Sequence, residues 1–376
     1  MCPSRSRLKP SQRKSNASIP ERQRGYSQVM MDLCAHLGLQ APLIQAPMAG
    51  VQDHRLAVAV CEAGGLGSLP AAMLSPDALA SALSAMTQAT SRAFNVNFFC
   101  HAAPVPDAAA DATWRQLLAP YYAELDLDIE AATRAPARVP FDHPMADVLQ
   151  AFKPAVVSFH FGLPAPDLLA RVKSWGSLVL SSATTVAEAQ WLQAHGADAV
   201  IAQGLEAGGH RGMFLSDALD QQLGLSRLLP AVLAAVNLPV IAAGGLATAQ
   251  DMARIRAMGA CGAQVGSAFL CCNESTTSDL HRTALLAADA PETALTRLFT
   301  GRPARGLVNR LMRELGPMHP AAPAFPLATA ALAPLRAAAE KRQRNDFSPM
   351  WAGQNFKACR TGSAADLTRE LLRGWL

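Results

Sequence analysis

Short apolar runs alternate with longer amphipathic stretches along the chain from residue 42 onward. Most of these runs are apolar throughout, as in parallel strands that are buried on both faces, and the stretches between them have the length and pattern of helices. Eight such runs can be counted: 43–48, 66–70, 94–99, 155–160, 177–182, 198–203, 239–243 and 262–266. The alternation predicts an α/β fold built from repeated βα units.

Helix-capping patterns support this division of the chain. Thr185 with Glu188, and Thr248 with Asp251, have the spacing of capping boxes. Each pair follows an apolar run and precedes an amphipathic stretch. We therefore expect helices to begin directly after these threonines.

Eight βα units predict a (β/α)8 barrel, the TIM barrel fold. The pattern breaks over 103–150, an insertion after the third strand whose helical part we expect to fold over one end of the barrel. A doubly wound open sheet is the alternative, but no GxGxxG follows the first strand. The expected parts are a disordered basic tail (1–30), the barrel (31–275) and a helical C-terminal extension packed on it (276–376).

The formal net charge of +4 could suggest a nucleic-acid partner, but its distribution does not. Seven Arg and Lys residues stand against one Glu in the first 25 residues, so the rest of the chain is slightly acidic. That tail lacks the apolar segment of a secretory signal. A transit peptide, or a true start at Met30 or Met31, also fits its composition.

Half of the residues are hydrophobic, which is enough for a large core, yet no stretch approaches the ~20 apolar residues of a membrane span. The eight cysteines form no CxxC pair, so they indicate reduced thiols rather than a disulfide framework or a zinc site. Together these features predict a cytoplasmic protein with neither a membrane nor a nucleic-acid partner.

In a TIM barrel the active site lies at the carboxyl ends of the strands, so the last residues of each run are candidates for function. Gly244-Gly245 ends the seventh run and Gly266-Ser267 the eighth. Phosphate groups in barrels are frequently bound by the loops after strands seven and eight, where glycine lets backbone N–H groups approach closely. These pairs predict a cofactor that carries a phosphate.

Polar side chains end three other apolar runs, namely Asn97, His160 and Gln203. A histidine at such a position can act as a general base or donate to a developing anion, although many strand-end histidines only satisfy a hydrogen bond. His210 and Arg211, in the next loop, could bind an anionic group. A metal site formed by His101, His160 and His210 is the weaker alternative, because HExxH and carboxylate clusters are absent from the sequence.

Four segments resemble nitronate monooxygenases, formerly called 2-nitropropane dioxygenases. The most specific segment is Ser-Phe-His-Phe-Gly, and the Glu-Ala-Gly-Gly-His loop is shared with FMN-dependent enoyl-acyl-carrier-protein reductases. The segments are Gln45–Gly50, Asn95–Phe99, Ser158–Pro164 and Gln203–Gly212, and the resemblance resumes near Trp351–Gln354.

The resemblance implies an FMN-dependent oxidoreductase. It would oxidise alkyl nitronates, and in some cases nitroalkanes, with O2 to a carbonyl compound and nitrite. His160 would be the catalytic base or the partner of the substrate anion, His210 a substrate contact, and Met48, Phe98 and Phe161 an apolar pocket. Together with the positions of residues at the strand ends, the resemblance predicts which residues bind the cofactor. They are Met48, Asn97, Gln203, Gly208, Gly244, Gly245, Gln264, Val265, Gly266 and Ser267.

Three other functions remain open at this point. The nearest is an FMN-dependent NAD(P)H reductase acting on a quinone or an enoyl thioester. A barrel metallohydrolase and a non-catalytic ligand-binding barrel belong to other classes. The flavin content of the purified protein separates the first alternative from the other two.

Overall fold

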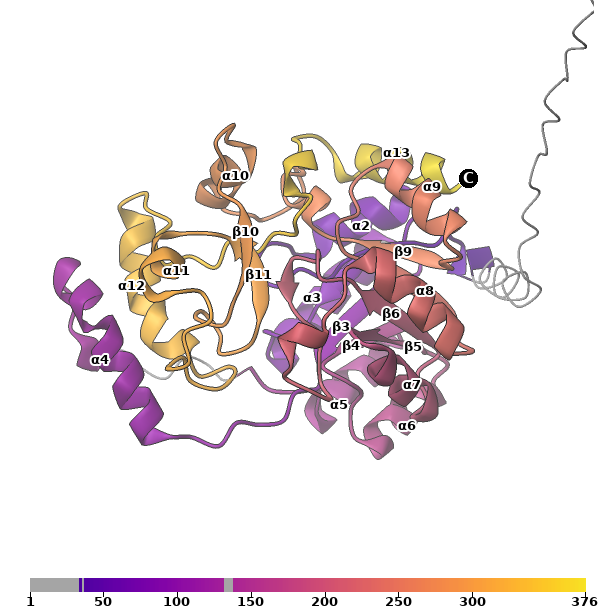
Figure 1. The fold of residues 1–376 in the computed structure, drawn as a ribbon. Helices are drawn as coiled ribbons and strands as arrows, with labels where there is room; N and C mark the ends of the chain where they lie inside the picture. The colour runs from indigo at the N-terminus through magenta and orange to yellow at the C-terminus, as the bar shows by residue number, and fades with distance from the viewer. Residues whose placement is uncertain (1–33, 36, 132–137) are drawn as a thin grey trace, which may run out of the picture.

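The structure is a computed structural model that describes residues 34–376 apart from 36 and 132–137 (Figure 1). The basic tail predicted for 1–30, and a start at Met30 or Met31, lie outside the described residues. Within the described part, no helix is long and apolar enough to cross a membrane.

Eight parallel strands form one sheet in the order β1-β9-β8-β6-β5-β4-β3-β2. A parallel bridge between Ile44 and Leu66 joins its two edges, so the sheet closes into a barrel. This order confirms the predicted TIM barrel and excludes the doubly wound sheet. The strands are β1 (Leu43–Gln45), β2 (Ser68–Pro70), β3 (Asn95–Phe99), β4 (Val156–His160), β5 (Leu178–Ala183), β6 (Ala199–Gln203), β8 (Val240–Ala243) and β9 (Gly262–Val265).

Seven of the barrel helices follow their strands, and the eighth comes from the end of the chain. Helix α13 packs against α9 and α2, and its buried Leu367, Leu371 and Leu372 join the core beside Leu43 of β1. Part of the chain beyond residue 276 therefore completes the barrel itself. The helices are α2 (His54–Glu62), α3 (Pro76–Ala89), α5 (His143–Phe152), α6 (Pro166–Ser174), α7 (Val186–Ala194), α8 (Leu225–Ala235), α9 (Ala249–Ala257) and α13 (Ala364–Trp375).

Both predicted threonine caps start helices, but only one is a complete capping box. The Thr248 hydroxyl accepts from the Asp251 N–H, and the Asp251 carboxylate accepts from the Thr248 N–H in return. Thr185 accepts from the Glu188 N–H in the same way. The Glu188 carboxylate instead accepts from Thr184 and from the loop at Phe214, because that loop lies over the start of α7.

A second lobe lies beside the barrel (Figure 1). Its core combines Trp114 and Tyr122 of the insertion with Leu298, Leu332 and Phe347 of the C-terminal region. It contains α4 (Ala108–Glu124), η1 (Ile129–Ala131), α10 (Asp279–Leu286), α11 (Arg310–Leu315), α12 (Thr329–Lys341) and the sheet β10 (Thr293–Thr296), β11 (Ala304–Leu307) and β7 (Gly209–His210).

The helical part of the insertion, which we expected over one end of the barrel, lies in the second lobe. Helix α4 packs on α12, and the Tyr122 hydroxyl donates to the Ala331 carbonyl at 2.6 Å. The indole N–H of Trp114 likewise donates to Ala328. The aromatic residues of α4 are buried in the second lobe. Helix α5, at the end of the insertion, is the third helix of the barrel.

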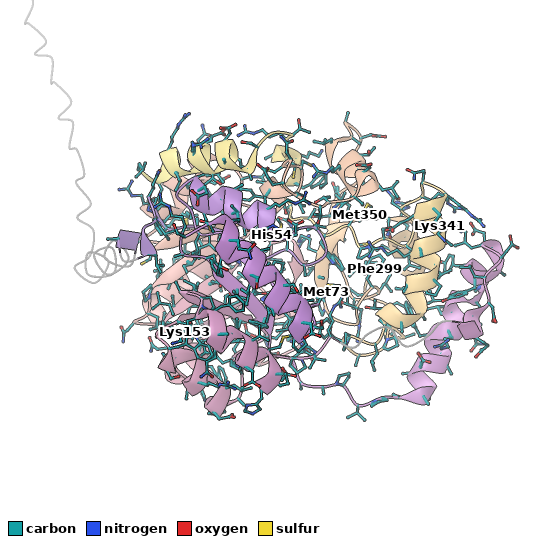
Figure 2. The ribbon with its side chains drawn as sticks, turned by 180° about the vertical axis from the view of Figure 1, so that it is seen from behind. His54, Met73, Lys153, Phe299, Lys341 and Met350 are labelled. Atoms are coloured by element: carbon teal, nitrogen blue, oxygen red, sulfur yellow. The ribbon has the colours of Figure 1, made fainter. Side chains whose placement is uncertain are left out.

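The lobe and the barrel remain visible as two masses from behind, with Phe299 and Lys341 on the lobe and His54 and Lys153 on the barrel (Figure 2). Besides η1, the described loops contain the 3₁₀ turns η2 (Leu219–Gln221), η3 (Ser267–Phe269) and η4 (Phe356–Ala358). The turns η3 and η4 pack together beside the carboxyl end of β9. This end of the barrel faces the second lobe.

Candidate active site

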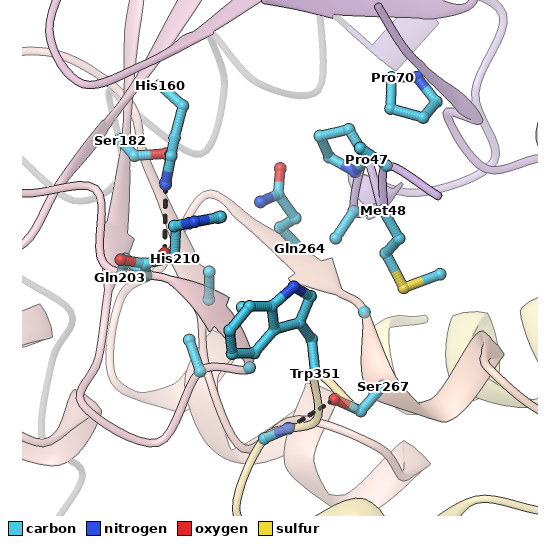
Figure 3. Close-up of a pocket in the computed structure, with 18 of the residues that line it drawn as sticks. Pro47, Met48, Pro70, His160, Ser182, Gln203, His210, Gln264, Ser267 and Trp351 are labelled. Carbon is cyan, nitrogen blue, oxygen red and sulfur yellow. Dashed lines mark hydrogen bonds between the residues drawn. The ribbon is translucent and has the colours of Figure 1, made fainter. Parts of the chain in front are cut away.

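A pocket with about 1390 Å³ of space free of protein atoms, part of it open to solvent, lies over the carboxyl ends of the barrel strands (Figure 3). Nearly all of the predicted site residues line it: Met48, Asn97, His160, Gln203, Gly208, His210, Gly244, Gly245, Gln264, Gly266 and Ser267.

Val265, predicted to contact the cofactor, does not line the pocket. Its side chain is buried in the core between the barrel strands and their helices. Phe98, expected in the apolar pocket, points outward in the same way and packs on Phe141, while its neighbour Phe99 lines the pocket. Successive side chains of a strand point to opposite faces, and this alternation explains both differences.

His160 is held at both ring nitrogens (Figure 3). Its Nε2 lies 3.2 Å from the His210 carbonyl oxygen, which can only accept, so Nε2 carries the proton and donates. Its Nδ1 lies 3.1 Å from the Ser182 hydroxyl and therefore accepts from it when the ring is neutral. The lone pair of the imidazole thus faces Ser182, whose side chain also lines the pocket.

Burial keeps the two pocket histidines uncharged. Desolvation lowers the pKa of His160 to about 4, with further lowering by Arg302 and Arg211. Desolvation, followed by the charge of Arg138, holds the pKa of His210 well below its usual range. Both rings are therefore neutral donors and acceptors near neutral pH.

These pKa values predict the pH dependence of turnover. A His160 pKa near 4 means that the ring stays neutral as the pH falls through 6.5, so we expect kcat/KM for a reaction that depends on the neutral ring to be flat between about pH 5.5 and 8. Stopped-flow or initial-rate profiles over this range measure it. An inflection near pH 6.5 would contradict the neutral state of the ring.

The loop after β6 is fixed by backbone and side-chain hydrogen bonds. The Gln203 amide donates to the His210 carbonyl at 3.0 Å and accepts from the Gly212 N–H at 2.8 Å. Arg211, expected to bind an anion, is fully buried and donates to the carbonyl oxygens of Gln203 and Gly204. It therefore positions the loop instead of facing the pocket.

The glycines after β8 and β9 form a cradle of backbone donors. Gly244 and Gly245 adopt positive φ values of 117° and 68°, which few other residues tolerate. Within the described part of the chain, nothing accepts a hydrogen bond from the N–H groups of Gly245, Leu246 or Gly266. Free backbone donors that line a pocket are suited to a phosphate group.

The other end of the pocket offers an acceptor. The Asn97 amide nitrogen donates to the Ser158 hydroxyl at 2.9 Å and to the Ser158 carbonyl at 3.2 Å. Its Oδ1 accepts no hydrogen bond from the described residues. The Asn97 side chain lines the pocket, so this oxygen is available to a donor on a bound molecule.

Several residues of the site were missed by sequence reasoning. Trp351, Asn355 and Arg138 reach the pocket from the C-terminal region and the insertion, and Ser182 comes from β5. Ser182 ends the fifth apolar run, so its position alone could have identified it. The other three depend on how the second lobe packs, which no local pattern shows.

A metal centre has no support in the geometry. Over the described ranges, no group of three or more His, Cys, Asp or Glu side chains is placed to hold an ion. His101 is turned to the Arg138 carbonyl at 3.0 Å, and His210 to the Thr300 hydroxyl at 3.0 Å. These histidines serve the packing of the pocket wall.

Comparison with known proteins gives one consistent family. The family model described as nitronate monooxygenase matches residues 31–374. A nitronate monooxygenase from Paraburkholderia phytofirmans is 40% identical over 346 residues, covering 90% of this chain and 93% of that protein. One from Pseudomonas aeruginosa is 38% identical over 338 residues, covering 89% and 96%.

Solved structures agree with this result. Nitroalkane oxidase from Streptomyces ansochromogenes superposes with a TM-score of 0.82 at 39% identity, covering 91% of this chain and 97% of that one. FabK from Thermotoga maritima follows with a TM-score of 0.68 at 25% identity, covering 92% and 95%.

Proposed function

Because the chain belongs to the nitronate monooxygenase family and is an oxidoreductase, we propose that it binds FMN and oxidises alkyl nitronates with O2 to a carbonyl compound and nitrite. Membership confirms the resemblance carried by the Ser158–Gly162 and Gln203–Gly212 segments. Flavin dependence is general in this family, whereas the choice of FMN and the roles of individual residues are our own assignment.

The observation that carries the proposal is the polarity of the pocket. One end has free N–H donors at Gly245 and Gly266, and the other has a free acceptor at Asn97 Oδ1. FMN carries a phosphate at one end and a ring with an N–H donor at the other. We assign the phosphate to the glycine loops with Ser267, and the ring to Asn97 and Gln203.

When bound, FMN supplies the redox chemistry by taking electrons from the substrate and passing them to O2. The role of the chain is to hold the substrate beside it. With a pKa near 4, His160 is a weak base. This favours an anionic nitronate, already deprotonated, over a neutral nitroalkane.

For a neutral nitroalkane, His160 would have to remove the α-proton. The proton would go to Nδ1, since Nε2 already carries one that it donates to His210. The Ser182 hydroxyl lies 3.1 Å from Nδ1. It would either break its hydrogen bond to Nδ1, so that the substrate proton can reach this atom, or pass the proton on to it. An anionic intermediate beside the ring would raise the His160 pKa and support this transfer.

The proposal predicts a yellow protein that forms nitrite from nitronate. We expect the purified protein to release FMN on heating, and ethylnitronate with O2 to give acetaldehyde and nitrite in equal amounts. Flavin chromatography and colorimetric nitrite assay measure both. A colourless protein that cannot be reconstituted with FMN would overturn the cofactor assignment.

The likeness to FabK keeps one alternative in view, an NAD(P)H-dependent reductase. Anaerobic mixing with NADH and NADPH separates the two functions. Under the proposed function the flavin stays oxidised on the time scale of turnover. Rapid bleaching by either nucleotide, with no nitrite from nitronate, would favour the reductase.

A further inference from the structure

We propose that Arg138 forms an anion-binding subsite that recognises the negative charge of the substrate. This inference rests on the proposed function, which names a nitronate as the substrate. The subsite would give a role to the insertion after β3, since Arg138 stands between η1 and α5 in the chain.

Arg138 is the one formally charged side chain among the described residues that line the pocket; the others are apolar, amide, hydroxyl, glycine or histidine. Its guanidinium Nη1 is buried and has no hydrogen-bond partner in the described part of the chain. A buried cation without a partner is costly, so such a group calls for an anion or an acceptor.

The position of Arg138 is fixed next to the reacting end of the pocket. Its backbone carbonyl accepts from His101 at 3.0 Å, and its guanidinium carbon lies 5.6 Å from the centre of the Phe325 ring. That ring packs in turn on His210, at 5.4 Å between ring centres. The charge of Arg138 also contributes to the low pKa of His210.

Two other arginines near the site, Arg211 and Arg302, do not line the pocket. Arg211 donates to the carbonyl oxygens of Gln203 and Gly204 and to Gln222. Arg302 lies 4.0 Å over the Phe161 ring and donates to the Met213 carbonyl, and its buried Nε has no partner in the described part of the chain.

The two pocket histidines are neutral near pH 7 and add no charge. Among the described residues that line the pocket, Arg138 is therefore the only one that offers an anion a full opposite charge at direct contact. Coulomb attraction in a partly buried site is much stronger than in water, so this one charge can decide between anionic and neutral substrates.

The test compares Arg138→Gln and Arg138→Lys in the FMN-loaded protein. For Arg138→Gln we expect KM for ethylnitronate to rise at least tenfold with kcat within about threefold, because a lost charge-assisted hydrogen bond weakens binding by at least this factor. KM for nitroethane should stay within about twofold. Arg138→Lys should recover most of the nitronate affinity, since it keeps the charge.

Two controls make the result specific. Arg227→Gln removes the same charge from an exposed site on α8 and should leave both KM values unchanged. FMN affinity, measured by fluorescence titration, should be the same in all variants. A weaker FMN complex in Arg138→Gln, or an equal loss for nitronate and nitroethane, would overturn the subsite.

Binding of nitrite gives a readout that does not need turnover. Calorimetry should show nitrite binding to the FMN-loaded wild type and at least tenfold weaker binding to Arg138→Gln. If the wild type forms no nitrite from nitronate yet binds nitrite through Arg138, the proposed function fails and the subsite stands. If nitrite binds equally to both proteins, the subsite fails whatever the activity.

Discussion

His160→Asn is expected to lower kcat/KM for nitroethane by about 10²–10⁴-fold, the usual contribution of a positioned general base. Asn cannot accept the substrate proton, and no other described side chain of the pocket offers an imidazole lone pair in contact with Ser182. The loss for ethylnitronate should be smaller, about tenfold, because that substrate needs no deprotonation. Oxygen consumption and nitrite release measure both.

His195→Asn is the matched control for this variant. His195 stacks on Trp191 at the end of α7, outside the pocket. It should leave both rates unchanged, and both variants should retain FMN. Unchanged nitroethane turnover in His160→Asn would remove His160 from the mechanism.

Gly208→Ala is expected to lower FMN affinity by about 10–100-fold, because overpacking a close backbone contact costs about 1–3 kcal/mol. A Cβ at this position would lie 2.5 Å from the Gly353 nitrogen and 2.6 Å from the Ala352 carbonyl carbon. Both are backbone atoms, so the segment itself must move. The Gly353 N–H donates to the Ser267 hydroxyl at 2.8 Å, and the shift would disturb that contact.

Fluorescence titration of apoprotein with FMN measures this effect. Gly176→Ala is a suitable control, because its Cβ would meet nothing within 4 Å although φ is +88°. It should cost about 1–2 kcal/mol of stability from the left-handed backbone and leave FMN binding intact. Equal FMN affinity in Gly208→Ala and wild type would contradict the placement of this loop in the cofactor site.

Much of the barrel was readable from the sequence. Strands buried on both faces are mainly apolar, and their alternation with amphipathic stretches marks all eight. Barrel geometry then places their carboxyl ends together, which predicted Asn97, His160 and Gln203 at one pocket. The glycines at 244–245 were predicted for the same reason, since a close backbone approach and a positive φ both require glycine.

The face of each side chain was harder to predict at the strand ends. Phe98 and Phe99 are identical in type and adjacent, yet only Phe99 lines the pocket. Asn97 and Gln264 face the pocket, so the alternation of side chains along β3 and β9 turns Phe98 and Val265 to the outer face. A contact of Val265 with the cofactor would have to come from its backbone.

Long-range packing decided the rest. The pattern of residues 364–375 predicts a helix but not that it completes the barrel between α9 and α2. Likewise, the sequence around Arg211 and Arg138 does not predict their different environments. Arg211 donates to backbone carbonyls, whereas Arg138 lines the pocket with Nη1 unpaired. The sequence by itself determined which segments are strands and helices and which strand ends carry chemistry, because burial and backbone freedom act locally. The tertiary structure decided which charges are satisfied and which face the substrate, because pairing depends on segments that are distant in the chain.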